Sequence, residues 1–204
     1  MSNKPIIVFE GVEGSGKTTH IKNVARYLKK NKKKFVKIRE PGGSNNAERI
    51  RKILLNKKSN FNKYTDLFLL MAARSENIEK IILKNYKKKI ILIDRFIDST
   101  VAYQHYGMGI NKKFIYFINK YLLKNIKPDF VFLHKVNQYN MTKRLNLRKN
   151  LNRYDNFNKS FYNKVQKGFV KQVKKNRNFL IIDSNNQINK NKEIIINKVR
   201  KLIK

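Results

Sequence analysis

The sequence predicts an α/β protein with an open sheet of parallel strands and helices on both faces. Short β-branched and aromatic runs alternate along the chain with longer segments of helical spacing, which is the pattern of a three-layer α/β domain. Three of the short runs are almost wholly apolar, as expected for strands buried on both faces of a parallel sheet. A glycine-rich loop follows the first run, and in such sheets ligands bind beyond the carboxyl ends of the strands.

Five short segments are the predicted strands of this sheet. They are residues 5–10 (PIIVFE), 35–39 (FVKIR), 90–94 (IILID), 130–134 (FVFLH) and 179–183 (FLIID). Between them, apolar residues recur at helical spacing, which predicts amphipathic helices that pack on the sheet. The spacing is clearest in four groups: Ile21, Val24, Ala25 and Leu28; Leu67, Leu70, Met71, Ile78 and Ile81; Phe161, Val165, Phe169 and Val173; and Ile195, Val199 and Leu202.

Length and composition indicate a single globular domain over residues 1–204. A chain of 204 residues can build one sizeable core, and 41% hydrophobic with 30% charged residues is typical of a soluble protein. The chain has no cysteine, which excludes a disulfide framework and a thiolate metal site. The apolar run near the N-terminus is too short for the core of a signal peptide, and no segment approaches the roughly 20 apolar residues that span a membrane. We therefore expect a cytoplasmic protein.

The net charge is +35, from 48 Lys and Arg against 13 Asp and Glu. One interpretation is nucleic-acid binding, because a basic surface gains affinity by releasing counterions from phosphates. However, the lysines are scattered through every segment, and the abundant Lys, Asn and Ile share A/T-rich codons. Dispersed charge of this kind is typical of solvated helix faces, so we do not expect specific nucleic-acid binding.

The segment GVEGSGKT (11–18) matches the phosphate-binding pattern G-x-x-x-x-G-K-[ST]. The glycines allow successive backbone N–H groups to turn towards a phosphate, Lys17 reaches the β- and γ-oxygens, and the hydroxyl of Thr18 is a ligand for Mg²⁺. The loop lies between an apolar strand and an amphipathic helix, which is the context that the motif requires. Glu13 does not fit this role, because a carboxylate repels the anion that the loop should attract.

Two further positions narrow the class of nucleotide-binding protein. Asp94 ends a buried strand, where its carboxylate can hold the water shell of the metal opposite Thr18, and Arg95 follows it. Arg74 lies on an apolar helical stripe and should point inward, where a guanidinium needs an anion or another acceptor. The guanine-reading motif N-K-x-D is absent, and motors and helicases usually have more domains. A small phosphotransferase with a small acceptor remains.

With these residues in place, the chain resembles the thymidylate kinase family over nearly its whole length. The matching motifs are FEGVEGSGKTT (9–19), REPGG (39–43), AAR (72–74), DRF-x-x-ST-x-AYQ (94–104), KPDFVFL (127–133) and an arginine-rich segment (144–153). The resemblance implies transfer of the γ-phosphoryl group of ATP to dTMP, giving dTDP and ADP for dTTP synthesis. It also implies a P-loop NTPase fold with five parallel strands, a requirement for Mg²⁺ and a homodimer.

The resemblance also assigns roles to single residues. Glu13 would contact the 3′-hydroxyl of the bound monophosphate, Arg95 would clamp its phosphate, and Arg74 would hydrogen-bond thymine. The other residues expected at the acceptor are Pro41, Leu70, Thr100, Tyr103 and Gln104, with Tyr103 beneath the deoxyribose. The residues expected at ATP are Gly11, Val12, Glu13, Gly14, Ser15, Gly16, Lys17, Thr18 and Arg144, the last of them near adenine. Mg²⁺ is assigned to Thr18 and Asp94.

The segment at about 144–155 matches the family's mobile lid. Some members have arginine after the loop acid; here the residue is Gly14, so the lid should supply the cation for the transition state. Together with Lys17 and Arg95, Arg148 and Arg153 are therefore the candidate catalytic residues.

Leu70 departs from the family pattern, which usually places phenylalanine against thymine. Two other functions stay open: a kinase for another (deoxy)nucleoside monophosphate, and a nucleotide-dependent nucleic-acid-binding protein.

Overall fold

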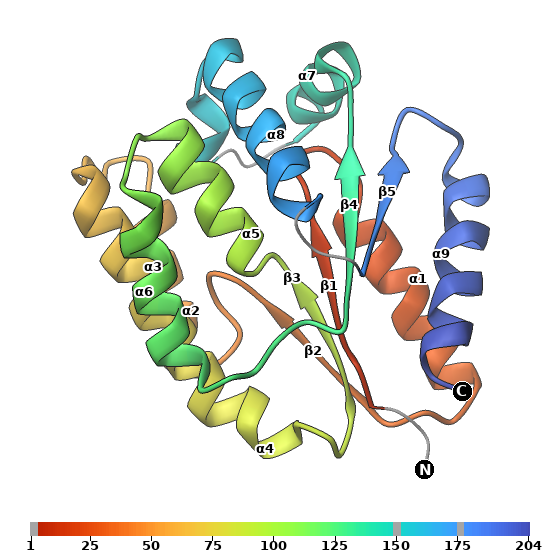
Figure 1. Cartoon of the computed structure of the whole chain (residues 1–204). Coiled ribbons are helices and arrows are strands. Elements are labelled where there is room, and N and C mark those ends of the chain that lie inside the picture. The colour runs from red at the N-terminus through yellow and green to blue at the C-terminus, as the bar shows by residue number, and fades with distance from the viewer. Residues whose placement is uncertain (1–3, 149–151, 175–177) are drawn as a thin grey trace.

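A computed structural model describes residues 4–148, 152–174 and 178–204. Its centre is a parallel five-stranded sheet in the order β2-β3-β1-β4-β5 (Figure 1). The strands are β1 (Ile6–Glu10), β2 (Phe35–Arg39), β3 (Ile90–Asp94), β4 (Phe130–Lys135) and β5 (Phe179–Asp183). The predicted α/β fold is confirmed, and every predicted strand end lies within one residue of the observed one.

The strand order explains which segments are apolar. β1 lies at the centre between β3 and β4, and all five of its side chains are buried. β2 and β5 form the two edges, where Ile38 and Ile182 are the one buried side chain of each strand. Burial on both faces therefore accounts for the almost wholly apolar sequences of the three inner strands.

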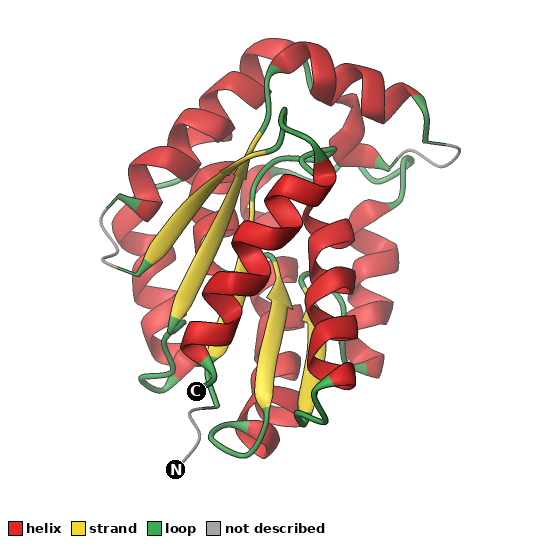
Figure 2. Cartoon of the chain, turned by 90° about the vertical axis from the view of Figure 1, so that its right-hand side faces the viewer, coloured by secondary structure: helices red, strands yellow, loops and turns green. Residues whose placement is uncertain are grey.

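Helices cover both faces of the sheet (Figures 1 and 2). On one face, α1 (Lys17–Lys30) and α9 (Ile188–Leu202) pack Val24 and Val199 against Phe9 and Phe132 of the inner strands. The opposite face is covered by a larger group of helices, which surround Val8, Ile93 and Val131. Among the described residues, no helix combines the length and the apolar character that crossing a bilayer requires.

The elements on the second face include three that sequence periodicity does not predict, α2, α6 and α7. Asn or Ser side chains cap most of the long helices there, as is typical of helix N-termini. The remaining elements are α2 (Asn45–Leu55), α3 (Lys63–Asn77), the π-helical η1 (Ile78–Ile82), α4 (Leu83–Asn85), α5 (Ile97–Thr100), the π-helical η2 (Val101–Gly107), α6 (Lys112–Leu123), α7 (Gln138–Asn146), the 3₁₀ turn η3 (Arg153–Asn156) and α8 (Lys159–Val173).

Because all strands run in the same direction, the segments that follow them meet at one edge of the sheet. The phosphate loop follows β1, Glu40 and Pro41 follow β2, and Arg95 follows β3. The candidate functional residues are therefore gathered at the carboxyl ends of the strands, where ligands bind in sheets of this kind.

Candidate active site

The phosphate loop connects the end of β1 to the first residue of α1. Gly11 has a φ of +137°, and a Cβ atom there would lie 2.3 Å from the carbonyl oxygen of His134, so a residue with a side chain does not fit. Gly16 precedes α1 with a φ of +83°. The first turn of an α-helix leaves backbone N–H groups without an intrahelical partner and carries the positive end of the helix dipole, so the start of α1 favours a bound phosphate.

Lys17 is folded back onto this loop. Its Nζ donates hydrogen bonds to the carbonyl oxygens of Gly11 and Val12, both at 2.8 Å, and to Ser15 Oγ at 3.3 Å. Burial, followed by repulsion from Arg95, lowers the pKa of Lys17 to about 7. A phosphate beside Lys17 would favour its charged form, so the loop is suited to an anionic ligand.

Thr18 and Asp94 meet at the junction of α1 and β3. Thr18 Oγ1 donates to Asp94 Oδ2 at 3.3 Å, and both residues line the same cleft. Within the described ranges, no cluster of three or more His, Asp or Glu side chains could hold a metal by itself. Mg²⁺ commonly uses one or two protein oxygens together with substrate phosphates, so this hydroxyl and carboxylate fit that ion.

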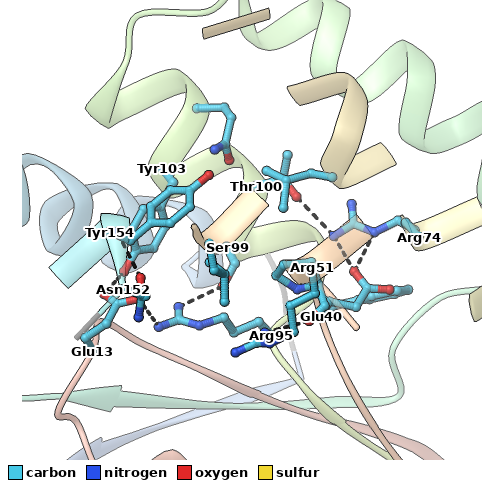
Figure 3. Close-up of a pocket in the computed structure, with 15 residues that line it drawn as sticks. Glu13, Glu40, Arg51, Arg74, Arg95, Ser99, Thr100, Tyr103, Asn152 and Tyr154 are labelled. Carbon is cyan, nitrogen blue, oxygen red and sulfur yellow. Dashed lines mark hydrogen bonds and ion pairs between the residues drawn. The ribbon is translucent and has the colours of Figure 1, made fainter. Parts of the chain in front are cut away.

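Glu13 points away from the loop and pairs with Arg95 (Figure 3). Its Oε1 accepts from Arg95 Nη2 at 2.7 Å, and its Oε2 accepts from the hydroxyl of Tyr103. Burial alone would raise the pKa of Glu13, but the charges of Arg95 and Lys17 outweigh it and hold the pKa below its usual value. The acid is therefore an anchored carboxylate that faces a neighbouring pocket.

Arg95 is held in place through the buried Glu10 at the end of β1. Glu10 Oε1 accepts from the backbone N–H groups of Phe96, at 2.8 Å, and Ser99, at 3.2 Å. These bonds hold the turn in which Arg95 has a φ of +68°, a conformation that costs about 1–2 kcal/mol for most residues. Arg95 Nη1 in turn donates to Gly11 O at 2.8 Å. Glu10 is not among the site residues predicted from the sequence.

Arg74 lines the same pocket that Glu13 faces, at the end far from Glu13. It is buried, as its place on the apolar stripe of α3 predicts. It donates from Nε to Glu40 Oε2 at 2.7 Å and from Nη2 to Thr100 Oγ1 at 3.0 Å. Burial raises the pKa of Glu40 in spite of the attraction of Arg74. Pro41, which follows a cis peptide bond, Leu70 and Gln104 line the same pocket, together with Phe96.

Two cavities meet at these residues. The first, here called the Arg74 pocket, extends from Glu13 and Tyr103 at one end to Arg74 at the other (Figure 3). The second, the loop cleft, contains Lys17, Thr18 and Asp94. The residues that line both cavities are Glu13, Glu40, Arg51, Arg95 and Asn152. Two ligands, one in each cavity, would therefore face each other across two arginines.

Arg51 is the clearest residue missed in the sequence. It belongs to α2, lines both cavities and donates from Nη1 to the carbonyl oxygen of Pro41 at 2.6 Å. Its spacing in the sequence could have shown that it points inward. Arg51 lies four residues after Ala47 and three before Leu54, the two buried apolar residues of α2. The same inward spacing identified Arg74.

The predicted lid arginines have separate surroundings. Arg144 donates to Gly14 O at 3.0 Å, behind the phosphate loop. Arg148 lines the loop cleft and pairs with Asp155 at 3.0 Å. Arg153 pairs with Asp66 of α3, and it is not among the lining residues of the two cavities. Residues 149–151 of the expected lid lie outside the described residues.

Comparisons with known proteins match this chain to one family over most of its length. The thymidylate kinase family model matches residues 9–195. A thymidylate kinase from Thermosipho africanus is 38% identical over 183 residues, which cover 89% of this chain and 90% of the relative. One from a Wolbachia of Brugia malayi is 42% identical over 167 residues, or 80% and 78% of the two chains.

The fold is also similar to a solved structure. The crystal structure of thymidylate kinase from Ehrlichia chaffeensis matches with a TM-score of 0.77 and 33% sequence identity, and the match covers 96% of this chain and 98% of that one. The match extends over the parallel sheet and the helices on both of its faces. By sequence and by structure, the chain belongs to the thymidylate kinase family.

Proposed function

We propose that the two cavities hold the two substrates of the thymidylate kinase reaction, with dTMP in the Arg74 pocket and ATP against the phosphate loop. The enzyme transfers the γ-phosphoryl group of ATP to dTMP and releases dTDP and ADP. One observation carries the assignment of the two cavities: they share Arg51 and Arg95. An acceptor phosphate and a donor phosphate would meet at these cations, and phosphoryl transfer depends mainly on such positioning and charge neutralisation.

On the ATP side, the proposal rests on the contacts of the loop. Lys17 would exchange its bonds to Gly11 O and Val12 O for oxygens of the β- and γ-phosphates, while the N–H groups at the start of α1 hold the phosphate chain. Thr18 would hold Mg²⁺ directly and Asp94 through the water shell of the ion, which would supply positive charge beside the phosphate chain. Arg144, which donates to Gly14 O and to Ser184 O, would border the nucleoside end of ATP.

On the dTMP side, the positions of the charges suggest the orientation. The phosphate would lie at Arg95 and Arg51, near the loop cleft, and the base would lie at Arg74 and Thr100, at the far end. Glu13 would accept a hydrogen bond from the 3′-hydroxyl, beside Tyr103, whose ring lies under the Arg95 guanidinium at 5.4 Å. The acceptor phosphate is already anionic, so this arrangement needs no general base.

The two lid candidates differ in how directly they could act. Arg148 lines the loop cleft and has a partly exposed side chain, so we assign it the role of neutralising the transferring group. Arg153 is anchored to Asp66 and also lies 5.1 Å from the ring of Tyr154. In this arrangement Arg153 would fasten the end of the lid segment, and it reaches the phosphates only if the lid moves.

We also propose that the enzyme is a homodimer joined through α3 and α6. These neighbouring helices carry exposed aromatic side chains: Phe68 is 53% exposed, Phe117 71% and Tyr121 80%. Phe68 also meets Phe114 edge to face at 6.2 Å. Large exposed apolar patches on one face are typical of an interaction surface, and a second copy presents the same face.

Sedimentation of the wild type and a Phe117→Lys variant tests this interface. We expect the variant to be a monomer at concentrations where the wild type is a dimer. Tyr139→Lys is the matched control, because Tyr139 is 73% exposed but belongs to α7. Equal masses for wild type and Phe117→Lys would contradict the interface.

The enzymatic assignment is tested by ADP release with dTMP, dUMP, UMP, dCMP and dGMP under excess ATP and Mg²⁺. We expect dTMP to give the highest kcat/KM and ATP hydrolysis without acceptor to be slow. Arg95→Ala should raise KM for dTMP far more than KM for ATP. A preference for another monophosphate would refute the assignment of the acceptor.

Because the reaction consumes ATP, we propose the cytoplasm as its compartment, which fractionation with antibodies would test.

A further inference from the structure

Asn119 is a buried polar residue in the middle of α6. The residue is only 2% exposed. The amide nitrogen donates to the carbonyl oxygen of Ile115, one helical turn earlier, at 2.8 Å. This bond fixes the orientation of the amide, so that Oδ1 accepts from Arg74 Nη1 at 2.5 Å. Asn119 is not among the residues that line the Arg74 pocket, so it supports Arg74 from behind.

The three partners of Arg74 hold its guanidinium plane in one orientation. Nε donates to Glu40, Nη2 donates to Thr100, and Nη2 also lies 2.7 Å from the same Glu40 oxygen. Asn119 takes one N–H of Nη1. Within the described part of the chain, these contacts leave the second N–H of Nη1 for a ligand. Because the five N–H groups form a rigid planar fork, the bond to Asn119 sets the direction of that free N–H.

We propose that Asn119 is a positioning residue for base recognition: it aims the free Nη1–H of Arg74 at a carbonyl oxygen of the pyrimidine. The inference rests on the proposed location of the base beside Arg74. Glu40 and Thr100 line the pocket and can respond to a ligand, whereas Asn119 is shielded from it. Of the three partners that hold the guanidinium, Asn119 is therefore the one that does not line the pocket.

A purely structural role makes a different prediction, and Asn191 provides the comparison. Asn191 is also 2% exposed, belongs to a long helix, α9, and donates to a backbone carbonyl, that of Asp183, at 2.8 Å. Replacing either asparagine by leucine should lower the melting temperature, because a buried polar group loses its partner. Only the loss of Asn119 should weaken dTMP binding.

The test measures steady-state kinetics of Asn119→Leu, Arg74→Ala, the double variant and Asn191→Leu. We expect Asn119→Leu to raise KM for dTMP on the order of tenfold, with kcat and KM for ATP nearly unchanged. In the Arg74→Ala background, Asn119→Leu should have no further effect on KM for dTMP, since residues that act through one another are not additive. Asn119→Asp, which keeps an acceptor for Arg74, should restore KM towards the wild-type value.

Two results would overturn the proposal: a folded Asn119→Leu variant with unchanged KM for dTMP, or a full additional effect of Asn119→Leu in the Arg74→Ala background. If Asn119→Leu does not fold, the smaller Asn119→Ala gives the same comparison. An unchanged KM in Arg74→Ala itself is a distinct failure, because it would refute the location of the base and the inference with it.

Discussion

Replacing Glu13 with glutamine tests the role of the acid in the phosphate loop, because the change keeps the shape of the side chain and removes its charge. In the structure, one carboxylate oxygen accepts from Arg95 at 2.7 Å and the other from Tyr103. Each oxygen can accept a second hydrogen bond, so the 3′-hydroxyl of dTMP can bind in addition to these two partners.

The size of the effect follows from the two bonds that change. A hydrogen bond from the 3′-hydroxyl to a carboxylate is worth about 1.5–3 kcal/mol, and one to the neutral amide oxygen of glutamine about 0.5–1.5 kcal/mol. The expected loss is therefore about 1–1.5 kcal/mol, or roughly 5- to 13-fold in kcat/KM. The variant also weakens the ion pair between residue 13 and Arg95. This loss does not involve the 3′-hydroxyl, so it lowers kcat/KM equally for every acceptor. The contribution of the sugar is therefore the ratio of the losses measured with dTMP and with 3′-deoxy-dTMP.

The assay is ADP release with both acceptors, for wild type and Glu13→Gln. We expect kcat/KM to fall markedly more for dTMP than for 3′-deoxy-dTMP. We expect KM for ATP to change little, because the Glu13 carboxylate faces Arg95 and Tyr103 and not the backbone of the phosphate loop. Equal losses of kcat/KM for the two acceptors would refute a hydrogen bond between Glu13 and the 3′-hydroxyl. A change in ATP affinity of the same size would indicate a role in the phosphate loop instead.

Three further predictions concern the loop, the base pocket and the core. Lys17→Ala should abolish transfer and leave the fold intact, because it removes charge at the γ-phosphoryl group; near-normal ADP release by a folded variant would contradict the loop assignment. Leu70→Phe should lower the Kd of dTMP by about 2- to 12-fold through stacking worth about 0.5–1.5 kcal/mol; weaker binding in calorimetry, with an unchanged fold, would show that another residue already fills that face. His134 is fully buried, and burial, then His20 and Lys17, hold its pKa well below the usual value. The unfolded chain therefore binds a proton more readily at this histidine than the folded protein does. The free energy of unfolding is highest above the unfolded pKa of about 6.5 and falls below it, by up to about 1.4 kcal/mol per pH unit. His134→Phe should reduce the fall in Tm between pH 7 and pH 5, and parallel Tm curves for the two proteins would speak against this.

Much of the fold was predictable because its signals are local. Each inner strand is a short apolar run, and the phosphate loop is a contiguous motif between a strand and a helix. The helix α6 was not predicted because Phe117 and Tyr121 are apolar residues on its exposed face. Apolar residues therefore occur all around the helix, and the sequence shows no clear helical periodicity there. α2 has only 11 residues, which gives periodicity little length in which to show.

The candidate site was predictable in its members but not in their pairing. Local spacing shows that Arg74 points inward, yet its partners Glu40 and Asn119 are 34 and 45 residues away along the chain. The link from Glu10 to the turn that holds Arg95 also depends on the register of the folded sheet. Asp66, the partner of Arg153, lies 87 residues from it, and no pattern in the sequence joins the two.

The central position of β1 has a consequence for synthesis of the chain. Ile6 pairs in register with Ile91 of β3, and Val8 pairs with Val131 of β4. Both neighbours leave the ribosome long after β1, and at about 5–20 residues per second the delay amounts to several seconds. During that time an apolar strand has neither of its partners, and unpaired strands of this kind promote aggregation. The nascent chain should therefore engage chaperones at Ile6–Glu10 until β3 and β4 emerge.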